Sequence, residues 1–177
     1  MSIEALKQLI PPPVAPLEVG EEASWQRTEH RLDTQLPNDY KSYIDTYGTG
    51  YFGPEDFSFL WPLNPFSATL SFFRFQRLLL EAYEECRLST PHECPFATWP
   101  VAGGLLSWGR TDNGDTLCWL TENEPDRWTT IVYDSKFIEY ERFSLSMTEF
   151  LVEWLRGSIT PCMFPHFSCQ VSFFSCS

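Results

Sequence analysis

The sequence predicts a single α+β domain in which helices pack on a mostly antiparallel sheet. The chain has 177 residues, which is enough for one domain with a sizeable core and leaves little room for a second. Hydrophobic residues make up 43% of it and aromatic residues 16%, so burial of aromatic rings should dominate the core energetics. Helical periodicity recurs in several segments, and strand patterns joined by short turns follow one another in the second half.

The first 18 residues predict a docking helix followed by a proline-rich linker. Apolar residues within 2–10 have helical spacing, and Pro11-Pro12-Pro13 and Pro16 then favour extended chain. We therefore expect the domain itself to span residues 19–157.

Two helices are expected next. In residues 21–35 an acidic first turn suits a helix N-terminus, and Trp25 and Leu32 repeat on one side. The second helix begins near Pro37 and ends at Gly48, a typical C-terminal stop. Its residues at positions i, i+3, i+4 and i+7 are Tyr40, Tyr43, Ile44 and Tyr47.

Short strands and a long helix should follow. Residues 51–60 are aromatic and are interrupted by Gly53-Pro54, which predicts one or two short strands around a turn. A helix is expected from about Ser67 to Arg87, and Pro91 and Pro95 predict a loop after it. The apolar stripe of this helix consists of Phe72, Phe75, Leu79, Ala82, Tyr83 and Cys86.

The strongest local signal is Asn113-Gly114, because this dipeptide favours a two-residue hairpin turn and strand-forming sequence flanks it. Counting outward from the turn, the predicted pairs are Asp112 with Asp115, Thr111 with Thr116, Arg110 with Leu117 and Trp108 with Trp119. The two indoles would fasten one face of the hairpin, and the two carboxylates would place like charges at its tip. Such a tip is either solvated or occupied by a partner.

The rest of the domain is expected to be two strands and a helix. The strands, 128–133 and 137–143, are joined by a short turn and extend the hairpin into an antiparallel meander. Ser146 and Glu149 have the spacing of a capping box, and the helix that they introduce ends at Gly157. Residues 158–177 are rich in Cys and Phe without a clear period, so we expect a tail there.

The formal net charge of −12 argues against direct binding to a phosphate backbone, which requires clustered Lys and Arg. A basic protein partner fits this charge better, although spread acidity also serves solubility alone. The N-terminus lacks a basic region followed by an apolar stretch, and no apolar run is long enough to span a membrane. We therefore expect a soluble cytoplasmic protein that binds neither nucleic acid nor membrane directly.

No cofactor and no metal are expected. Residues 48–53 match the glycine spacing of a dinucleotide-binding loop, but they follow a helix and precede a strand, which is the reverse of the required order. Residues 112–115 resemble the start of a calcium loop whose later ligands are out of register. Zinc is an alternative for the tail, where the residues with suitable chemistry, although without the paired spacing of common zinc modules, are Cys162, His166, Cys169 and Cys176.

Catalytic motifs are also missing from the sequence. It contains no nucleophile elbow, no phosphate-binding loop and no zinc-protease helix. His30, His92 and His166 are scattered, and a histidine without an arranged partner is rarely a catalyst. We therefore expect a protein that is not an enzyme.

The expected helix at residues 37–48 resembles a family hallmark. Leu36-Pro37-Asn38-Asp39-Tyr40-Lys41, with the later Gly48 and Gly50, is similar to the L-P-x-D-Y-K helix and glycine turn of the SUKH superfamily, which contains the Smi/Knr-type proteins. The Asn113-Gly114-Asp115 hairpin, the Pro125-Asp126 turn and the closing helix agree in order, so the resemblance covers residues 19–157. The motif residues to which we assign a structural role are Leu36, Pro37, Asp39, Tyr40, Gly48 and Gly114.

The resemblance implies an α+β fold without enzyme activity or cofactor. Many superfamily members are immunity proteins encoded beside polymorphic toxins, often nucleases or nucleic-acid deaminases, and a fungal branch regulates cell-wall synthesis. The expected function is therefore to bind and neutralise a basic cognate toxin. The alternative is a non-catalytic scaffold or regulator of the Smi/Knr type. The toxin's identity and the oligomeric state stay open.

A toxin-binding surface is expected at the hairpin tip and the next loop. The candidate residues are Asp112, Asp115, Glu122, Glu124, Asp126, Trp119 and Trp128. Acidic side chains would speed the encounter with a basic partner, and buried tryptophan contacts would slow release. The alternative is that both tryptophans belong to the core and that the acids are merely solvated. The phenylalanine-rich tail is a further candidate for self-association or partner binding.

Overall fold

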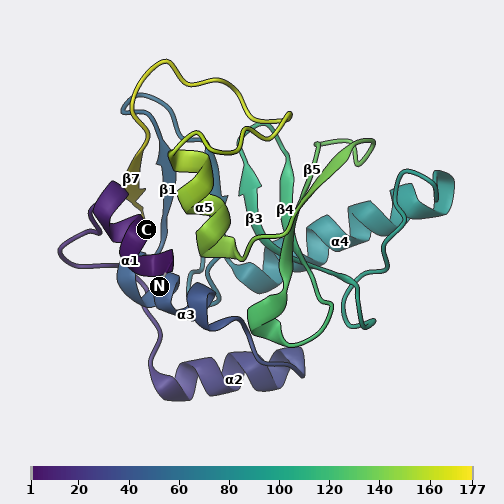
Figure 1. Ribbon diagram of the computed structural model, residues 1–177. Coiled ribbons are helices and arrows are strands. Elements are labelled where there is room, and N and C mark those ends of the chain that lie inside the picture. Colours follow the sequence, from purple (N-terminus) through teal and green to yellow (C-terminus); the bar gives the residue numbers. More distant parts are fainter. Residues whose placement is uncertain (1, 177) are drawn as a thin grey trace.

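The computed structural model describes residues 2–176, which form a seven-stranded sheet with five α-helices around it (Figure 1). The helices are α1 (Ser2–Leu9), α2 (Glu22–Leu32), α3 (Asn38–Tyr47), α4 (Phe72–Ser89) and α5 (Met147–Leu155). The strands are β1 (Gly50–Gly53), β2 (Leu60–Pro62), β3 (Leu105–Thr111), β4 (Thr116–Leu120), β5 (Thr129–Tyr133), β6 (Tyr140–Phe143) and β7 (Ser172–Ser175). A short 3-10 helix, Pro125–Arg127, lies between β4 and β5.

The sheet is antiparallel throughout. Its strand order is β6-β5-β4-β3-β2-β1-β7, so β1 to β6 form a meander and β7 returns from the C-terminal region to pair with β1. Helices α1, α3 and α5 lie on one face of the sheet, and α4 lies on the other (Figure 1). The predicted α+β class with a mostly antiparallel sheet is confirmed.

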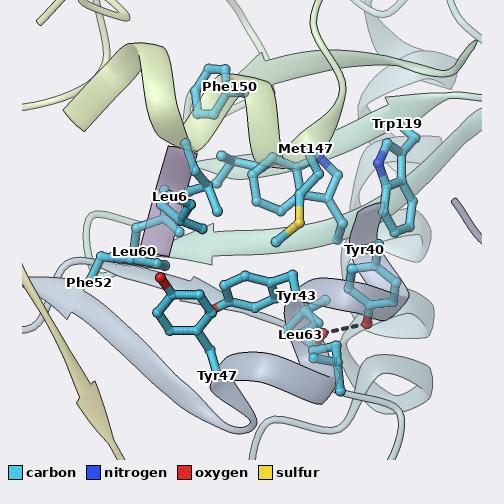
Figure 2. Packing of buried hydrophobic residues seen from close by; sticks show 14 of the residues in the cluster. Leu6, Tyr40, Tyr43, Tyr47, Phe52, Leu60, Leu63, Trp119, Met147 and Phe150 are labelled. Carbon is cyan, nitrogen blue, oxygen red and sulfur yellow. Dashed lines mark hydrogen bonds between the residues drawn. The ribbon is translucent and has the colours of Figure 1, made fainter. Parts of the chain in front are cut away.

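The central strands are buried on both faces. Leu117 and Trp119 of β4 pack under α3 and α5, whereas Cys118 and Leu120 alternate with them and belong to the smaller core under α4. Figure 2 shows the larger core, in which Tyr40 of α3 lies beside Trp119, and Tyr43 and Tyr47 lie below Leu6 and Met147 in the view.

The predicted helix ends are confirmed where a specific signal marks them. Gly48 ends α3 at a φ of +68°, and a Cβ there would lie 2.1 Å from the carbonyl oxygen of Leu17, so only glycine fits. At the start of α5, the side chain of Ser146 accepts a hydrogen bond from the backbone N–H of Glu149, whose side chain binds back in a complete capping box. These caps fix where α3 and α5 begin and end, and therefore how they lie on the sheet.

The predicted hairpin register is wrong by one residue next to the turn and by two residues beyond a bulge in β3. Arg110 pairs with Thr116, and Trp119 lies opposite Leu106 instead of Trp108, because β3 carries a bulge at Trp108. The turn holds three residues, 112–114, and only Gly114 has a positive φ, +91°. A two-residue turn of the preferred type needs positive φ at both positions, which Asn113 does not adopt. The indoles of Trp108 and Trp119 still lie side by side, with ring centroids 6.5 Å apart.

Two further boundaries differ from the prediction. Helix α4 begins at Phe72 rather than near Ser67, because the hydroxyl of Ser67 accepts hydrogen bonds from the backbone N–H groups of Thr69 and Leu70 and holds a turn there. Strand β6 begins at Tyr140, because the carboxylate of Asp134 accepts hydrogen bonds from backbone N–H groups of a turn that extends to residue 139.

The two ends of the chain are integrated into the domain. Leu6 of α1 is fully buried, in keeping with a docked helix. The C-terminal segment is not a separate tail, because β7 completes the sheet and Phe164 is buried against Phe59, with ring centroids 4.9 Å apart. A four-residue strand without charges carries little sequence signal, which explains why β7 was not predicted.

Candidate protein-binding surface

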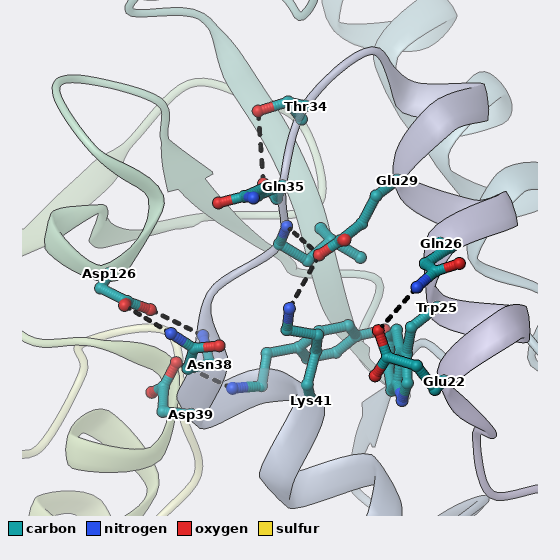
Figure 3. Close-up of polar contacts among 12 residues, drawn as sticks. Glu22, Trp25, Gln26, Glu29, Thr34, Gln35, Asn38, Asp39, Lys41 and Asp126 are labelled. Atoms are coloured by element: carbon teal, nitrogen blue, oxygen red, sulfur yellow. Dashed lines mark hydrogen bonds and ion pairs between the residues drawn. The ribbon is translucent and has the colours of Figure 1, made fainter.

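The motif at the start of α3 holds elements of the fold together (Figure 3). Glu29 of α2 accepts hydrogen bonds from the backbone N–H of Leu36 and from Lys41, each at 2.9 Å. Asp39 accepts hydrogen bonds from the backbone N–H and the hydroxyl of Thr148 in the first turn of α5, at 3.0 and 2.8 Å. These contacts fix α3 between α2 and α5.

Tyr40 and Asp126 complete this structural role. The Tyr40 hydroxyl, fully buried, donates to the carbonyl oxygen of Leu63 over 2.6 Å (Figure 2). Asp126, one of the candidate toxin-binding residues, accepts hydrogen bonds from the backbone and side-chain nitrogens of Asn38, both at 2.7 Å. Its carboxylate therefore anchors the loop before β5 to the N-terminus of α3, where a negative charge is also favoured by the helix dipole.

The candidate residues do not form one surface. The hairpin tip and the loop 121–128 lie at opposite ends of β4, a strand of five residues, and so roughly 17 Å apart at about 3.4 Å per residue. Asp112 and Asp115 belong to the first end, and Glu122, Glu124 and Asp126 belong to the second. The first end also holds the β1–β2 turn, with the exposed residues Glu55, Asp56 and Phe57.

Three candidates lie inside the protein. Trp119 is fully buried, and Trp128 is 3% exposed, so the alternative that both belong to the core is the correct one. Asp115 was expected at an exposed tip but is 4% exposed, and its carboxylate accepts a hydrogen bond from the hydroxyl of Thr111 at 2.8 Å. Burial raises the pKa of Asp115 above its ordinary value, more than the hydrogen bond from Thr111 lowers it.

The remaining candidates are exposed. Glu122 forms an ion pair with Arg142, with an oxygen–nitrogen distance of 2.7 Å, and Glu124 precedes the 3-10 helix. Exposed pairs of this kind contribute little to stability, so Glu122 and Glu124 are free to meet a partner at small cost.

An aromatic row crosses the sheet on the face that carries α4. Tyr51 of β1 lies opposite Phe174 of β7, and their rings stack with centroids 5.2 Å apart. The ring of Trp61 in β2 lies 4.6 Å from that of Tyr51. Trp61 lies opposite Arg110, whose guanidinium is 5.0 Å from the ring of Phe75 in α4. Phe174, Tyr51 and Trp61 thus make a continuous ridge that ends beside α4.

The ridge belongs to neither core. All three rings are partly exposed, and none packs against a residue of the two buried clusters in the described chain. Contiguous exposed apolar surface of this kind marks interaction sites in soluble proteins, and Trp and Tyr are the residues that contribute most to protein interfaces.

Asp112 connects the ridge to the hairpin tip. Its carboxylate accepts a hydrogen bond from the indole N–H of Trp61 at 2.9 Å and another from the hydroxyl of Ser58. The guanidinium of Arg110 lies 3.9 Å away. Of the acidic candidates, Asp112 is therefore the one that the fold joins to an exposed aromatic surface.

The sequence gives little indication of this ridge. Tyr51 and Trp61 come from consecutive strands of four and three residues, and Phe174 follows more than 100 positions later in another strand of four. Phe174 reaches Tyr51 only because β7 pairs with β1, and nothing in the sequence of residues 158–177 predicts that pairing.

The described residues contain no group of three or more His, Cys, Asp or Glu side chains that is able to hold a metal ion. Cys162, Cys169 and Cys176 are free thiols. None of the helices in residues 2–176 is both long and apolar enough to cross a membrane.

Comparison with known families gives a match over most of the domain. The model of the SUKH_6 family, described as SMI1-KNR4 cell-wall, matches residues 22–151. This range begins at the first residue of α2 and ends within α5, so it contains the α3 motif and strands β1 to β6, while α1 and β7 lie outside it. No curated protein and no solved structure matches the chain.

Proposed function

The chain belongs to the SUKH_6 family of the SUKH superfamily, and from this premise we propose that it is an immunity protein. It binds a cognate protein toxin in the cytoplasm and neutralises it stoichiometrically, without catalysing a reaction. The toxin is basic and acts on nucleic acid, because an active site that holds phosphates requires Lys and Arg. The net charge of −12 then favours the encounter with such a partner.

The observation that carries the proposal is the exposed ridge of Tyr51, Trp61 and Phe174 with Asp112 at its end. A partly exposed tryptophan whose indole is held by a carboxylate loses little side-chain freedom on binding. Aromatic anchors beside charged groups are typical of residues that dominate binding energy. We place the toxin on this ridge, with Glu55 and Asp56 at its rim.

A separate acidic surface lies at the other end of β4 and consists of Glu122, Glu124 and Asp126. Asp126 is engaged with Asn38, so its contribution to toxin binding would compete with its role in the fold. Glu122 and Glu124 stay candidates for long-range attraction only, because they lie far from the ridge.

The second candidate function is a non-catalytic scaffold or regulator. The cell-wall term in the description of the matched family favours it. A pull-down distinguishes the two, because an immunity protein captures one dominant toxin and a scaffold captures several regulatory proteins.

Co-expression with the product of the adjacent gene tests the proposal. The wild-type chain should restore growth to a host that produces the toxin, and the Trp61→Ala, Phe174→Ala double variant should not. The matched control is Tyr140→Ala, which removes a partly exposed ring at the opposite edge of the sheet. Growth restored equally by the ridge variant would show that the toxin binds elsewhere.

A further inference from the structure

A groove of about 530 Å³ runs along the flank of α4 that faces away from the aromatic ridge. Its apolar wall consists of Phe73 and Leu80 from α4 and Trp99 from the loop before β3. All three side chains are partly exposed, so the wall is open to an apolar side chain from outside. Glu81 and Glu85 stand exposed on its rim.

Gln76 lines this groove and has an unused donor. The side chain is 8% exposed, and its Oε1 accepts a hydrogen bond from the backbone N–H of Ser107 at 2.7 Å. Its Nε2 has no hydrogen-bond partner among the described residues. A buried donor without an acceptor is unfavourable, so a carbonyl oxygen placed within reach of this amide would be favoured.

The rim is acidic and only partly neutralised. Glu81 lies 4.0 Å from Arg77 in an exposed pair, which is weak. Glu84 accepts hydrogen bonds from Thr98 at 2.6 Å and from Arg87 at 2.8 Å, and the hydrogen bond from Thr98 is the main reason that the pKa of Glu84 is lowered. The carboxylate of Glu85 accepts no hydrogen bond within residues 2–176, so Glu81 and Glu85 are the acids available to an incoming cation.

We propose that this groove binds an extended peptide segment in which a Lys or Arg stands next to an apolar side chain. The apolar side chain packs on Phe73, Leu80 and Trp99, the cation lies between Glu81 and Glu85, and a backbone carbonyl accepts from Gln76. The inference rests on the proposed function in one respect, since the segment is assigned to the bound toxin. The groove would give the toxin a second contact with this chain, on the flank of α4 that faces away from the ridge.

Nuclear magnetic resonance of the full chain labelled with ¹⁵N tests the groove without the toxin. The probe is a capped hexapeptide of alternating Leu and Lys, and the control peptide carries Glu in place of Lys. We expect saturable shifts of the Gln76 side-chain NH₂ and the Trp99 indole N–H with the Lys peptide alone. No shift at these two groups, or equal shifts with the Glu peptide, would overturn the inference.

Substitutions at the rim complete the test. Glu81→Gln with Glu85→Gln should raise the dissociation constant of the Lys peptide about fivefold, as expected for the loss of two exposed charge contacts. Glu22→Gln with Glu139→Gln removes the same charge from exposed positions outside the groove and should change it less than about twofold. An unchanged constant in the rim variant would contradict the inference. Peptide binding in the groove without toxin binding to the chain would instead refute the proposed function alone.

Discussion

Trp61 donates its indole N–H to the carboxylate of Asp112 over 2.9 Å, which joins a partly exposed ring on β2 to the turn between β3 and β4. The contact gives the indole a fixed orientation on the surface of the sheet. It also holds a negative charge beside the aromatic ridge, where a basic partner would meet both. Of the contacts on the ridge, this pair contributes most to the proposed binding site.

Asp112 should act mainly on the rate of association. Asp112→Asn keeps the shape of the side chain and removes its charge, so the association rate constant with the toxin should fall roughly two- to fivefold at low salt. The difference should shrink as salt is added. Stopped-flow fluorescence measures both effects, with Glu22→Gln as a control for the loss of one exposed charge. An association rate that is insensitive to salt would remove the electrostatic part of the account.

Asp115 should act on stability instead. Asp115→Ala leaves the buried hydroxyl of Thr111 without the acceptor of its proton and should lower the free energy of unfolding by about 1–3 kcal/mol. Asp112→Ala affects a more exposed carboxylate and should cost about 1 kcal/mol or less. Urea denaturation measures the free energy of unfolding of both variants and shows whether Asp115→Ala costs more than Asp112→Ala. Equal costs would mean that the two carboxylates have similar environments.

The raised pKa of Asp115 gives a signed dependence of stability on pH. The folded state binds this proton more tightly than the unfolded state, so the contribution of Asp115 is fully present below its ordinary pKa of 3.8 and is lost as pH rises through the raised value. The Asn side chain of the Asp115→Asn variant cannot ionise, so the variant should not lose this contribution to stability as pH rises. The stability of the variant relative to the wild type should therefore increase as pH rises from 3.8, as measured by urea denaturation at several pH values. A constant difference would contradict the raised pKa.

The C-terminal segment should behave as part of the core. Phe164→Ala removes a ring that is 6% exposed and packs on Phe59 and Trp154, so it should cost about 3–5 kcal/mol of stability. Phe174→Ala, on the exposed ridge, should cost less than about 2 kcal/mol. Thermal unfolding of both variants is the measurement. An unaffected Phe164 variant would restore the interpretation of residues 158–177 as a tail outside the domain.

Elements with local signals were predictable from the sequence. The spacing of Tyr40, Tyr43, Ile44 and Tyr47 identified α3, and the Ser146–Glu149 capping box identified the start of α5, because both depend on neighbours within one or two turns. The hairpin was predicted in place but not in register, since its turn holds three residues instead of two and β3 carries a bulge at Trp108, whose indole is buried in the core. Pairing of β7 with β1 joins residues more than 100 positions apart and has no local signal.

The binding surface was predictable only in part. The choice of acidic residues at the hairpin tip identified Asp112, but it also selected Asp115, whose side chain is buried in the hairpin. Charge and residue type do not say which face of a strand points outward when a turn gains one residue. Phe174 becomes a neighbour of Tyr51 and Trp61 only through the long-range pairing of β7 with β1.

Isothermal titration calorimetry of the chain with the toxin encoded beside it measures whether the partner binds on the ridge. We expect a 1:1 complex, a dissociation constant raised about 30-fold or more by Trp61→Ala, and no comparable change with Tyr140→Ala. Urea denaturation of the Trp61 variant checks that its fold is intact. A folded Trp61 variant that binds the toxin as tightly as the wild type would contradict the claim that this ridge is where the partner binds.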